Sequence, residues 1–376
     1  LNVGDANLTG NELNNVLYAG AGNNILNGAT GTDTVSYYYG ATGSLGVKVS
    51  LAASGAQITG GSGSDTLISV ENLTGSNNND TLTGSTGNNA IDGGAGVDTM
   101  TGADGSDTYY VRNIGDSVVE TNTNATTGGT DHVHSYLTAY TLGANIENGR
   151  ILNTGTANLT GNDLNNVLYA GVGNNILTGG IGTDSVSFYY GVTGSTGVTV
   201  VLNSGSATAT GGSGTDTLTG IERLYGSNNN DSLTGDIYAN YLSGYAGNDT
   251  LNGGDGVDTL LGGVGKDSLT GGNGNDIFDF NALSEMGITS TTWDVITDFK
   301  LGDKIDLSTL DANAVSTTTN EAFAYMGSAA FTAAGQLRYD ATAKVLYGNT
   351  DANLTTAEFA IQLTGVSTLS ATDFVL

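Results

Sequence analysis

The chain has no cysteine, no proline and few basic residues, with 9 Lys plus Arg against 37 Asp plus Glu among its 376 residues. Without cysteine, disulfides and thiol catalysis are excluded. The formal net charge of −28 at pH 7 argues against nucleic acid or an anionic membrane as a partner. No apolar run is long enough to span a membrane. Because so much charge of one sign opposes compaction, we expect a cationic ligand to offset it.

Glycine is abundant, with 60 residues, and it is periodic. From Gly226 to Asp279 a nine-residue unit repeats without a gap. Its clearest copies read GYAGND at 244–249, GGDGVD at 253–258, GGVGKD at 262–267 and GGNGND at 271–276. A polar residue and then a leucine follow the first three aspartates, and Ile277 and Phe278 follow Asp276. This regularity favours ordered turns over the disorder that such a glycine content would otherwise indicate.

The residue types in this unit predict calcium sites. Glycines permit positive φ and let backbone carbonyls converge, while aspartate adds a charged, hard oxygen. Oxygen-only ligand sets suit Ca²⁺ and disfavour soft metals. A fixed nonapeptide of this kind is typical of a calcium-binding β-helix. The predicted fold is therefore all-β: a parallel β-roll, or β-helix solenoid, with two nonapeptides per coil.

Turns 18 residues apart should face each other and share an ion. This predicts ligands from a set of repeat aspartates and glycines: Asp80, Asp98, Asp107, Asp231, Asp249, Asp255, Asp258, Asp267, Asp276, Gly244, Gly247, Gly253, Gly254, Gly256, Gly262, Gly263, Gly265, Gly271, Gly272 and Gly274. A weaker set lies in single loops without a full partner at that spacing, and calcium there is an open alternative: Asp33, Asp65, Asp184 and Asp216. Where Asn15 and Asn24 replace aspartate, an asparagine ladder that bonds the turn backbone is the alternative to calcium.

The larger pattern is a duplication, because residues 7–108 align with 158–259 at a constant offset of 151. The expected organisation is a first β-roll copy at 1–108 with a hairpin insertion near 37–59, a β connector at 109–157, a second copy at 158–280 with an insertion near 188–210, and a C-terminal β-sandwich-like cap at 281–376. No N-terminal signal peptide is visible, and the chain opens within repeat-like sequence. We expect it to be the C-terminal part of a longer protein.

These repeats resemble the RTX (repeats-in-toxin) family. The segment WDVITDFKLGDKIDL at 293–307 is similar to the region after the repeats in serralysin-type C-terminal domains, as are AGQLRY at 334–339 and FAIQL at 359–363. The resemblance implies an uncleaved C-terminal signal read by the type I secretion machinery of a Gram-negative bacterium. It also implies a secreted, extracellular protein that folds on several Ca²⁺ ions outside the cell.

Catalytic groups are not evident. His132 and His134 lie on one face of an expected strand and could bind a transition metal, although two ordinary strand residues are the simpler interpretation. The tyrosine-rich stretches at 37–39 and 188–190 could pack in the interior or form a surface for glycans or self-assembly. Asp298, Asp303 and Asp306 could hold a further ion or form a solvated turn.

Two main functions remain open, beside a third in which the chain is a carbohydrate-binding module, since repeats of this type also accompany alginate-modifying enzymes. The first is a non-catalytic calcium-binding region of a bacterial surface or structural protein, such as an S-layer, filament or adhesin, which the duplication favours. The alternative is a secretion and folding module of an RTX enzyme, such as a protease, a lipase or an alginate-modifying enzyme, whose catalytic domain lies upstream.

Overall fold

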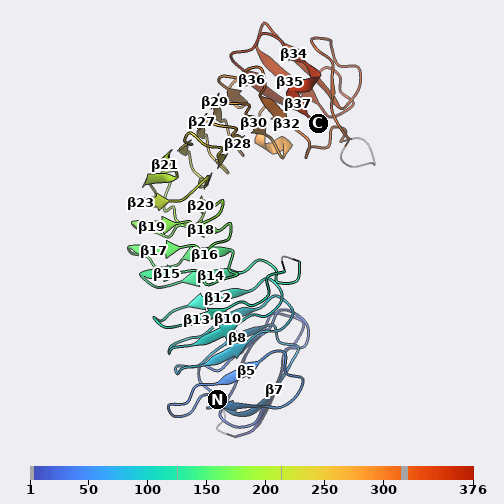
Figure 1. Cartoon of the computed structure of the whole chain (residues 1–376). Coiled ribbons are helices and arrows are strands. Elements are labelled where there is room, and N and C mark those ends of the chain that lie inside the picture. Colours follow the sequence, from blue (N-terminus) through green and yellow to red (C-terminus); the bar gives the residue numbers. More distant parts are fainter. Residues whose placement is uncertain (1–3, 125, 213, 315–320) are drawn as a thin grey trace. The chain divides into compact units, whose positions relative to one another are not determined.

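The computed structural model describes residues 4–124, 126–212, 214–314 and 321–376. Apart from two short 3₁₀ turns, η1 (Leu283–Glu285) and η2 (Ala371–Asp373), its regular elements are strands. The chain divides into two compact units: Leu1–Leu168 with Gly179–Gly182, and Tyr169–Thr178 with Thr183–Leu376. In each unit the strands stack like rungs (Figure 1). Among the described residues, no helix has the length and apolar character needed to cross a membrane.

The first unit is built from short parallel strands on two sides of a coil. One side holds β2 (Val16–Tyr18), β4 (Thr34–Ser36), β8 (Asn72–Thr74), β10 (Ala90–Asp92), β12 (Thr108–Val111), β14 (His132–Ser135) and β16 (Asn148–Ile151). The other side holds β1 (Ala6–Thr9), β3 (Asn24–Asn27), β7 (Gly63–Ile68), β6 (Gln57–Gly60), β13 (Ser117–Val119), β11 (Thr99–Thr101), β9 (Thr81–Thr83), β5 (Lys48–Ser50), β15 (Ala139–Thr141) and β17 (Ala157–Thr160). Strand β18 (Val167–Tyr169) lies at the boundary between the units.

The second unit repeats this plan. One side holds β20 (Ser185–Ser187), β24 (Arg223–Tyr225), β26 (Tyr241–Ser243), β28 (Thr259–Leu261), β30 (Ile277–Asp279), β32 (Lys304–Asp306) and β37 (Phe374–Val375). The other holds β19 (Asn175–Thr178), β23 (Gly214–Thr219), β22 (Ser206–Gly211), β21 (Val198–Asn203), β25 (Ser232–Thr234), β27 (Thr250–Asp255), β29 (Ser268–Asn273), β31 (Asp294–Ile296), β36 (Phe359–Leu363), β35 (Val345–Asn349), β34 (Gln336–Asp340) and β33 (Ala324–Tyr325). The predicted all-β fold with a parallel roll is confirmed.

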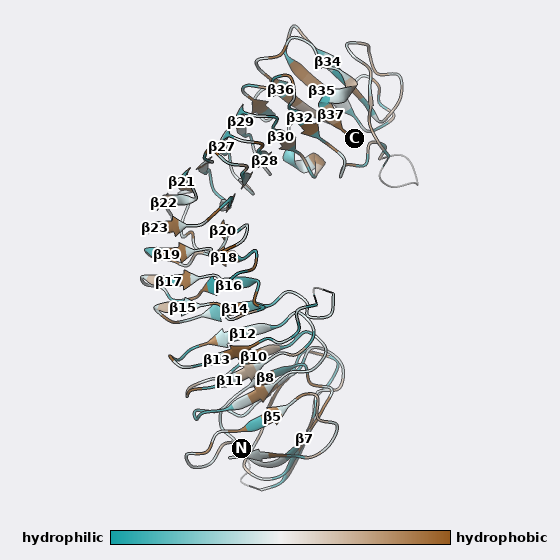
Figure 2. Cartoon of the chain, in the orientation of Figure 1, coloured by the Kyte–Doolittle hydropathy of each residue, from teal (hydrophilic) through white to brown (hydrophobic). Residues whose placement is uncertain are grey.

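The core is a set of apolar columns produced by the 18-residue register. In the second unit Leu242 pairs with Leu260, and Leu233 with Leu251, in parallel ladders. All four side chains are fully buried. Figure 2 shows apolar positions, in brown, within strands such as β23, whereas most turns are pale or teal. One coil cannot bury its own apolar face, so each depends on its neighbours in the stack.

Each unit also contains an antiparallel hairpin that departs from the coil. In the second unit β21 pairs antiparallel with β22, and β22 with β23. In the first unit β6 pairs antiparallel with β7. Because the hairpin is looped out, β7 returns to pair in parallel with β3, which belongs to the coil before the insertion.

The C-terminal segment continues the roll. Strands β34, β35 and β36 form an antiparallel meander, and β36 pairs in parallel with β31 of the coil. On the opposite side β37 pairs in parallel with β32. Both layers of the second unit are thereby extended by residues from the end of the chain, which covers the last apolar residues of the coil.

Candidate calcium sites

Aspartates of successive coils form columns in which each carboxylate bonds to the previous coil. Asp249 Oδ1 accepts a hydrogen bond from the Asp231 backbone N–H at 2.7 Å, and Asp267 Oδ1 accepts one from the Asp249 N–H at 2.7 Å. In the second column Asp276 Oδ1 accepts from the Asp258 N–H at 3.1 Å. The structure thus brings together turns 18 residues apart, as the repeat predicts.

The first unit has the same arrangement. Asp98 Oδ1 accepts from the Asp80 N–H at 2.8 Å, and Asp107 Oδ1 accepts from the Asn89 N–H at 2.6 Å. One oxygen of each carboxylate is therefore committed to the backbone. The other oxygen determines what a turn can bind.

That second oxygen is buried and has no hydrogen-bond partner, within the described chain, at Asp33 of the weaker predicted set and at five positions of the main set: Asp98, Asp107, Asp249, Asp258 and Asp267. Leaving a buried charged oxygen unpaired is costly. Backbone carbonyls converge on the same places. A Cβ added to Gly244 would fall against Asp249 Oδ2 and the Gly262 carbonyl oxygen, so only glycine leaves this space open. A carboxylate oxygen and a carbonyl oxygen facing one gap form a donor set that fits Ca²⁺.

The electrostatics support the same fit. Burial raises the pKa of Asp249 to about 8 and the pKa of Asp258 and Asp267 to about 7. Neighbouring carboxylates add to the rise, while the backbone N–H donors oppose it. In the first unit burial likewise raises the pKa of Asp98 to about 7. A divalent cation would oppose this rise, because it stabilises the charged form of each buried carboxyl.

Two predicted ligands are already saturated by protein donors. Asp231 Oδ2 accepts a hydrogen bond from the Ser227 N–H at 2.6 Å, and its Oδ1 accepts from the Val198 N–H at 2.6 Å. Asp80 has the equivalent donors, Ser76 and Val47. Serine stands at the second glycine position of the repeat in GSNNND, and its hydroxyl adds a further donor: Ser227 Oγ donates to Asp231 Oδ1 at 2.9 Å, as Ser76 Oγ does to Asp80 Oδ1 at 2.8 Å. These two aspartates begin their columns with fewer free oxygens than those that follow.

Sequence reasoning missed Asp294, which extends one column of the second unit. Asp294 Oδ1 accepts from the Asp267 N–H at 2.7 Å, and its Oδ2 is buried and unpartnered in the described chain. Burial raises the pKa of Asp294 to about 8. It was missed because 27 residues, not 18, separate it from Asp267, although WDVITDF carries its aspartate before a strand as the repeats do.

A lysine ends the other column. Asp303 Oδ1 accepts from the Asp276 N–H at 3.1 Å, which places Asp303 within the column and not in a solvated turn. Lys300 Nζ lies 3.3 Å from Asp276 Oδ2 and 3.5 Å from Asp303 Oδ1, and it also donates to the Gly272 carbonyl oxygen. The ammonium thus contacts the donor set that would otherwise face a metal ion. Asp298 accepts from the Gly271 and Gly272 N–H groups and bonds the same turn.

The weaker set of aspartates also bonds to neighbouring coils, although the printed partners of Asp33, Asp65 and Asp216 are asparagines, and those of Asp65 and Asp216 lie 41 residues away. Asp65 Oδ1 accepts from the Asn24 N–H at 2.8 Å, and Asp216 Oδ1 accepts from the Asn175 N–H at 2.7 Å. Asp33 Oδ1 accepts from the Asn15 N–H at 2.7 Å. Asp184 is fully buried, and its N–H donates to Glu222 Oε2 at 2.8 Å. All four occupy column positions, and calcium binding there stays a prediction.

Asp255 is different from the other predicted ligands. Its side chain is exposed, and Oδ1 accepts a hydrogen bond from the Asn273 amide at 2.6 Å. The other predicted glycines line the turns: Gly247, Gly254, Gly256, Gly263, Gly265, Gly272 and Gly274 have positive φ, and Gly253, Gly262 and Gly271 face the carboxylate of their own repeat. His132 and His134 are half-buried strand residues, and His132 Nε2 lies 3.1 Å from the Asn148 amide.

Comparison with known protein families identifies the family of this chain. The family described as peptidase M10 serralysin C terminal matches residues 164–376, which is more than half of the chain. The chain belongs to this serralysin C-terminal family. The RTX calcium-binding nonapeptide repeat matches residues 2–36 and 74–109 as well. The predicted resemblance is confirmed, and RTX repeats imply several bound Ca²⁺ ions.

Solved structures with similar segments include two subunits, AlgE6R3 and AlgE6R2, of the mannuronan C5-epimerase of Azotobacter vinelandii. Each is 28% identical over 39% of this chain, with a TM-score of 0.29, covering 77% and 88% of those chains respectively. The extracellular lipase LipA of Serratia marcescens is 18% identical over 70% of this chain and 45% of its own, with a TM-score of 0.24. No curated protein matches the chain.

For a serralysin C-terminal domain with RTX repeats, the supported function is a secreted calcium-binding module, and the C-terminal domain points to type I secretion. The matched regions are repeat and secretion-type regions, which are non-catalytic.

Proposed function

We propose that this chain is a calcium-folded module whose aspartate columns hold the ions that make its coils stable. The observation that carries the proposal is the set of buried, unpartnered Oδ2 atoms facing glycine carbonyls, as at Asp249 and Gly262. Each coil buries few apolar side chains, and its carboxylates repel one another without a cation. Folding and calcium binding should therefore be one event, as in other metal-dependent domains.

The ligands we assign are column aspartates with a buried, unpartnered oxygen, together with the carbonyls of the facing glycine turns: Asp33, Asp98, Asp107, Asp249, Asp258, Asp267 and Asp294. Asp80 and Asp231 act mainly as hydrogen-bond acceptors at the column starts. When bound, Ca²⁺ neutralises the negative charge of these carboxylates. In a calcium-poor cytosol the chain would stay unfolded and fit for export, and it would fold in a calcium-rich medium.

For its role outside the cell, we propose a non-catalytic part of a bacterial surface or structural protein. The supporting observation is a row of tyrosines in the second unit, namely Tyr169, Tyr189, Tyr190, Tyr225, Tyr241 and Tyr245. Neighbouring ring centroids lie between 4.9 and 5.9 Å apart. Tyr189 and Tyr190 are 43% and 48% exposed. Half-exposed aromatic rings with hydroxyls suit a glycan or another copy of the chain.

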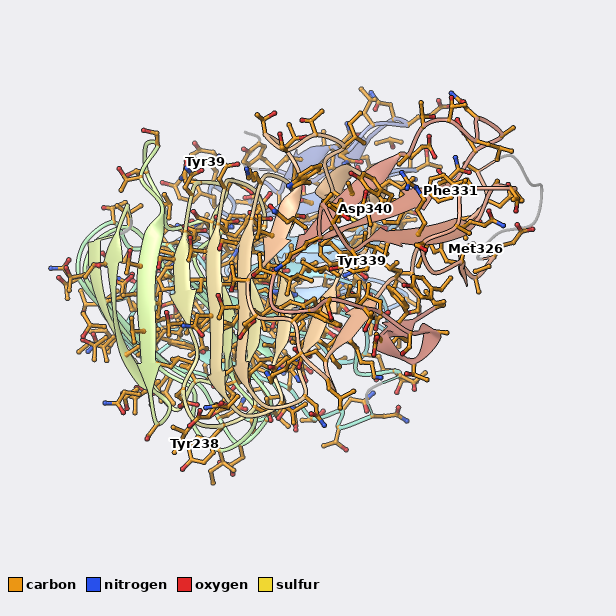
Figure 3. All side chains as sticks on the ribbon, turned by 90° about the horizontal axis from the view of Figure 1, so that it is seen from above. Tyr39, Tyr238, Met326, Phe331, Tyr339 and Asp340 are labelled. Carbon is orange, nitrogen blue, oxygen red and sulfur yellow. The ribbon has the colours of Figure 1, made fainter. Side chains whose placement is uncertain are left out.

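The first unit has an equivalent group in Tyr18, Tyr38 and Tyr39, which precede Tyr169, Tyr189 and Tyr190 by 151 residues. A binding surface present twice suits an adhesin or an array subunit. The test is binding of the calcium-loaded chain to cell-surface glycans, and its assembly state, in a Tyr189→Ala/Tyr190→Ala variant. Tyr238, which is 58% exposed and points away from the strands in Figure 3, provides the control Tyr238→Ala. Loss of glycan binding or of assembly in the double variant, but not in Tyr238→Ala, supports the proposal. A wild-type chain that neither binds glycans nor assembles contradicts it.

The second candidate is a secretion and folding module of an RTX enzyme, which the match to a peptidase family's C-terminal region favours. Sequencing the full-length protein upstream of Leu1 separates the two. A catalytic domain there would support the enzyme module, and further repeats would support the surface protein.

A further inference from the structure

The coil after Asp107 departs from the repeat at two positions. Tyr109 pairs with Ile91 in the parallel ladder of β10 and β12, so a phenol occupies an aliphatic core position. Glu120 follows Val119, which pairs with Thr101 across β11 and β13, so Glu120 takes the place of a repeat glycine. Tyr109 is fully buried, and its hydroxyl donates a hydrogen bond to Glu120 Oε1.

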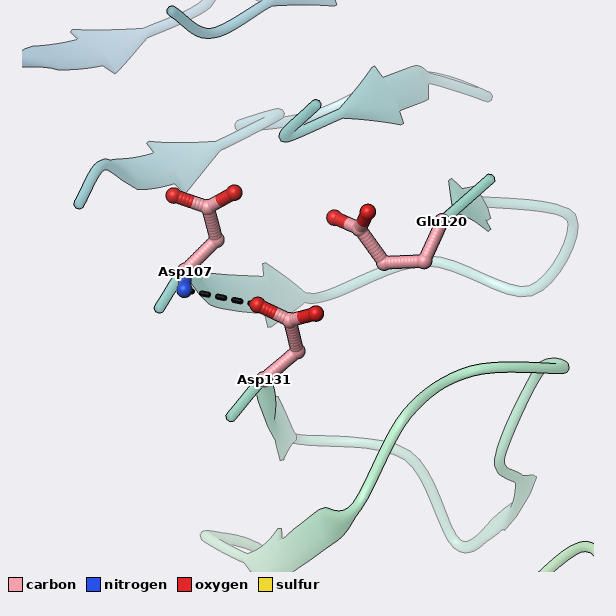
Figure 4. A group of neighbouring side chains, drawn as sticks. All are labelled: Asp107, Glu120 and Asp131. Carbon is pink, nitrogen blue, oxygen red and sulfur yellow. Dashed lines mark hydrogen bonds between the residues drawn. The ribbon is translucent and has the colours of Figure 1, made fainter. Parts of the chain in front are cut away.

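These departures create a buried cluster of three carboxylates, Asp107, Glu120 and Asp131. Their exposed fractions are 0%, 6% and 2%, and one oxygen of each lies within 4.8 Å of the others. Figure 4 shows the Glu120 carboxylate directed toward the two aspartates. Asp107 Oδ2 and Glu120 Oε2 are buried without a hydrogen-bond partner among the described residues. Asp131 Oδ1 accepts from the Asp107 N–H at 2.7 Å, which fixes their spacing.

The second unit provides an internal comparison. At an offset of 151, Gly253, Asp258, Leu260 and Gly271 correspond to Gly102, Asp107, Tyr109 and Glu120. A Cβ on Gly253 would meet Asp258 Oδ2 and the Gly271 carbonyl oxygen. A Cβ on Gly102 would meet Asp107 Oδ2, the Tyr109 hydroxyl and Glu120 Oε1 instead. A carboxylate oxygen thus stands where the repeat offers a glycine carbonyl.

We propose that Asp107, Glu120 and Asp131 bind one Ca²⁺ ion in a three-carboxylate site, with Tyr109 orienting Glu120. Ca²⁺–oxygen distances of about 2.3–2.6 Å allow two ligands of one ion to lie up to about 5.2 Å apart, which accommodates this cluster. Three negative charges that share one buried space need a cation, and carboxylate oxygens select a hard one. Glu120 and Asp131 lie outside the nonapeptides, so two of the three ligands are ones that the repeat pattern does not supply. The competing explanation is that Glu120 is a neutral acid that only bonds Tyr109.

The test is the number of calcium ions bound per folded chain, measured by equilibrium dialysis of the full chain with Glu120→Gln. The variant keeps the size of the side chain and a group that can bond the Tyr109 hydroxyl. We expect one ion fewer than in the wild type. Glu12→Gln, an exposed position, removes the same charge and should leave the number unchanged. An unchanged number in a folded Glu120→Gln chain would overturn the proposal.

If Glu120→Gln does not fold, Tyr109→Phe decides, because it keeps the ring and all three carboxylates. With Tb³⁺ as the probe, the tyrosine-excited terbium emission should fall in Tyr109→Phe, since the phenol adjoins the proposed ion. Tyr110→Phe is the control, because Tyr110 lies on the outer side of β12 against His134. Emission equal in both variants would contradict the site. Neither contradicting result would affect the calcium-dependent folding of the wild type, so the proposed function is tested separately.

Discussion

Replacing Asp249 by asparagine should remove one calcium ion from the folding equilibrium while preserving the column. The asparagine carbonyl oxygen can still accept the Asp231 N–H, which lies 2.7 Å from Asp249 Oδ1. What is lost is the charge of the unpartnered Oδ2 beside the Gly262 carbonyl. The change therefore separates the metal contribution from the backbone hydrogen bond.

The magnitude follows from linkage. An ion that binds only the folded chain adds about 1.4 kcal/mol to the free energy of unfolding for each tenfold rise in calcium above its dissociation constant. At about 100 times that constant, one lost ion costs about 2.7 kcal/mol. The calcium dependence of stability in Asp249→Asn should thus be shallower than in the wild type by about one ion.

The assay is urea unfolding followed by circular dichroism at a series of calcium concentrations. Asp255→Asn is the matched control, because Asp255 is exposed and bonded to Asn273, and the substitution changes the charge equally. The control should keep the wild-type slope. If Asp249→Asn kept that slope too, Asp249 would not be a ligand and the assignment of the columns would be refuted.

Three further predictions concern charge and packing. Burial raises the folded-state pKa of Asp249 to about 8, above its unfolded value of about 3.9. The calcium-free folded state is therefore favoured at low pH and loses that stability as pH rises through about 8. Lowering the pH from about 8 to about 5 in a chelator should increase β-structure by circular dichroism, and a spectrum that stays unfolded would count against this prediction. Lys300→Met removes the ammonium between Asp276 and Asp303 and should raise the calcium bound per chain by one in dialysis. Lys266→Met is the control and should leave the number unchanged, because Lys266 Nζ donates to the Ser290 carbonyl oxygen, away from the columns. Leu251→Ala empties a fully buried core position and should lower the free energy of unfolding in calcium by about 2–5 kcal/mol in urea titrations; a loss well below that range would show that the coil collapses onto the gap.

The regular part of the site could be predicted because the turn chemistry and the core share one period. Once a nonapeptide gives two strands per coil, residues 18 apart must face each other, which places Asp249 beside Asp267 and Leu251 beside Leu269. Backbone geometry alone dictates this, so no long-range information is needed.

Where a coil changes length, the same reasoning fails. Asp65 faces Asn24 at a separation of 41 residues because 41 − 18 = 23 residues are looped out into the hairpin. Asp294 lies 27 residues after Asp267, since an added loop with η1 interrupts the period. The Lys300 contacts depend on a long flexible side chain reaching back into a turn, and no periodic pattern signals that.

The most direct test of calcium-coupled folding is circular dichroism of this chain, with light scattering, as calcium is raised from a chelator to about 10 mM, above the about 10⁻⁴–10⁻³ M constants of extracellular modules. We predict a cooperative gain of β-structure with calcium and none with an equal concentration of magnesium. A β-spectrum that is already complete in the chelator and indifferent to calcium would contradict the account.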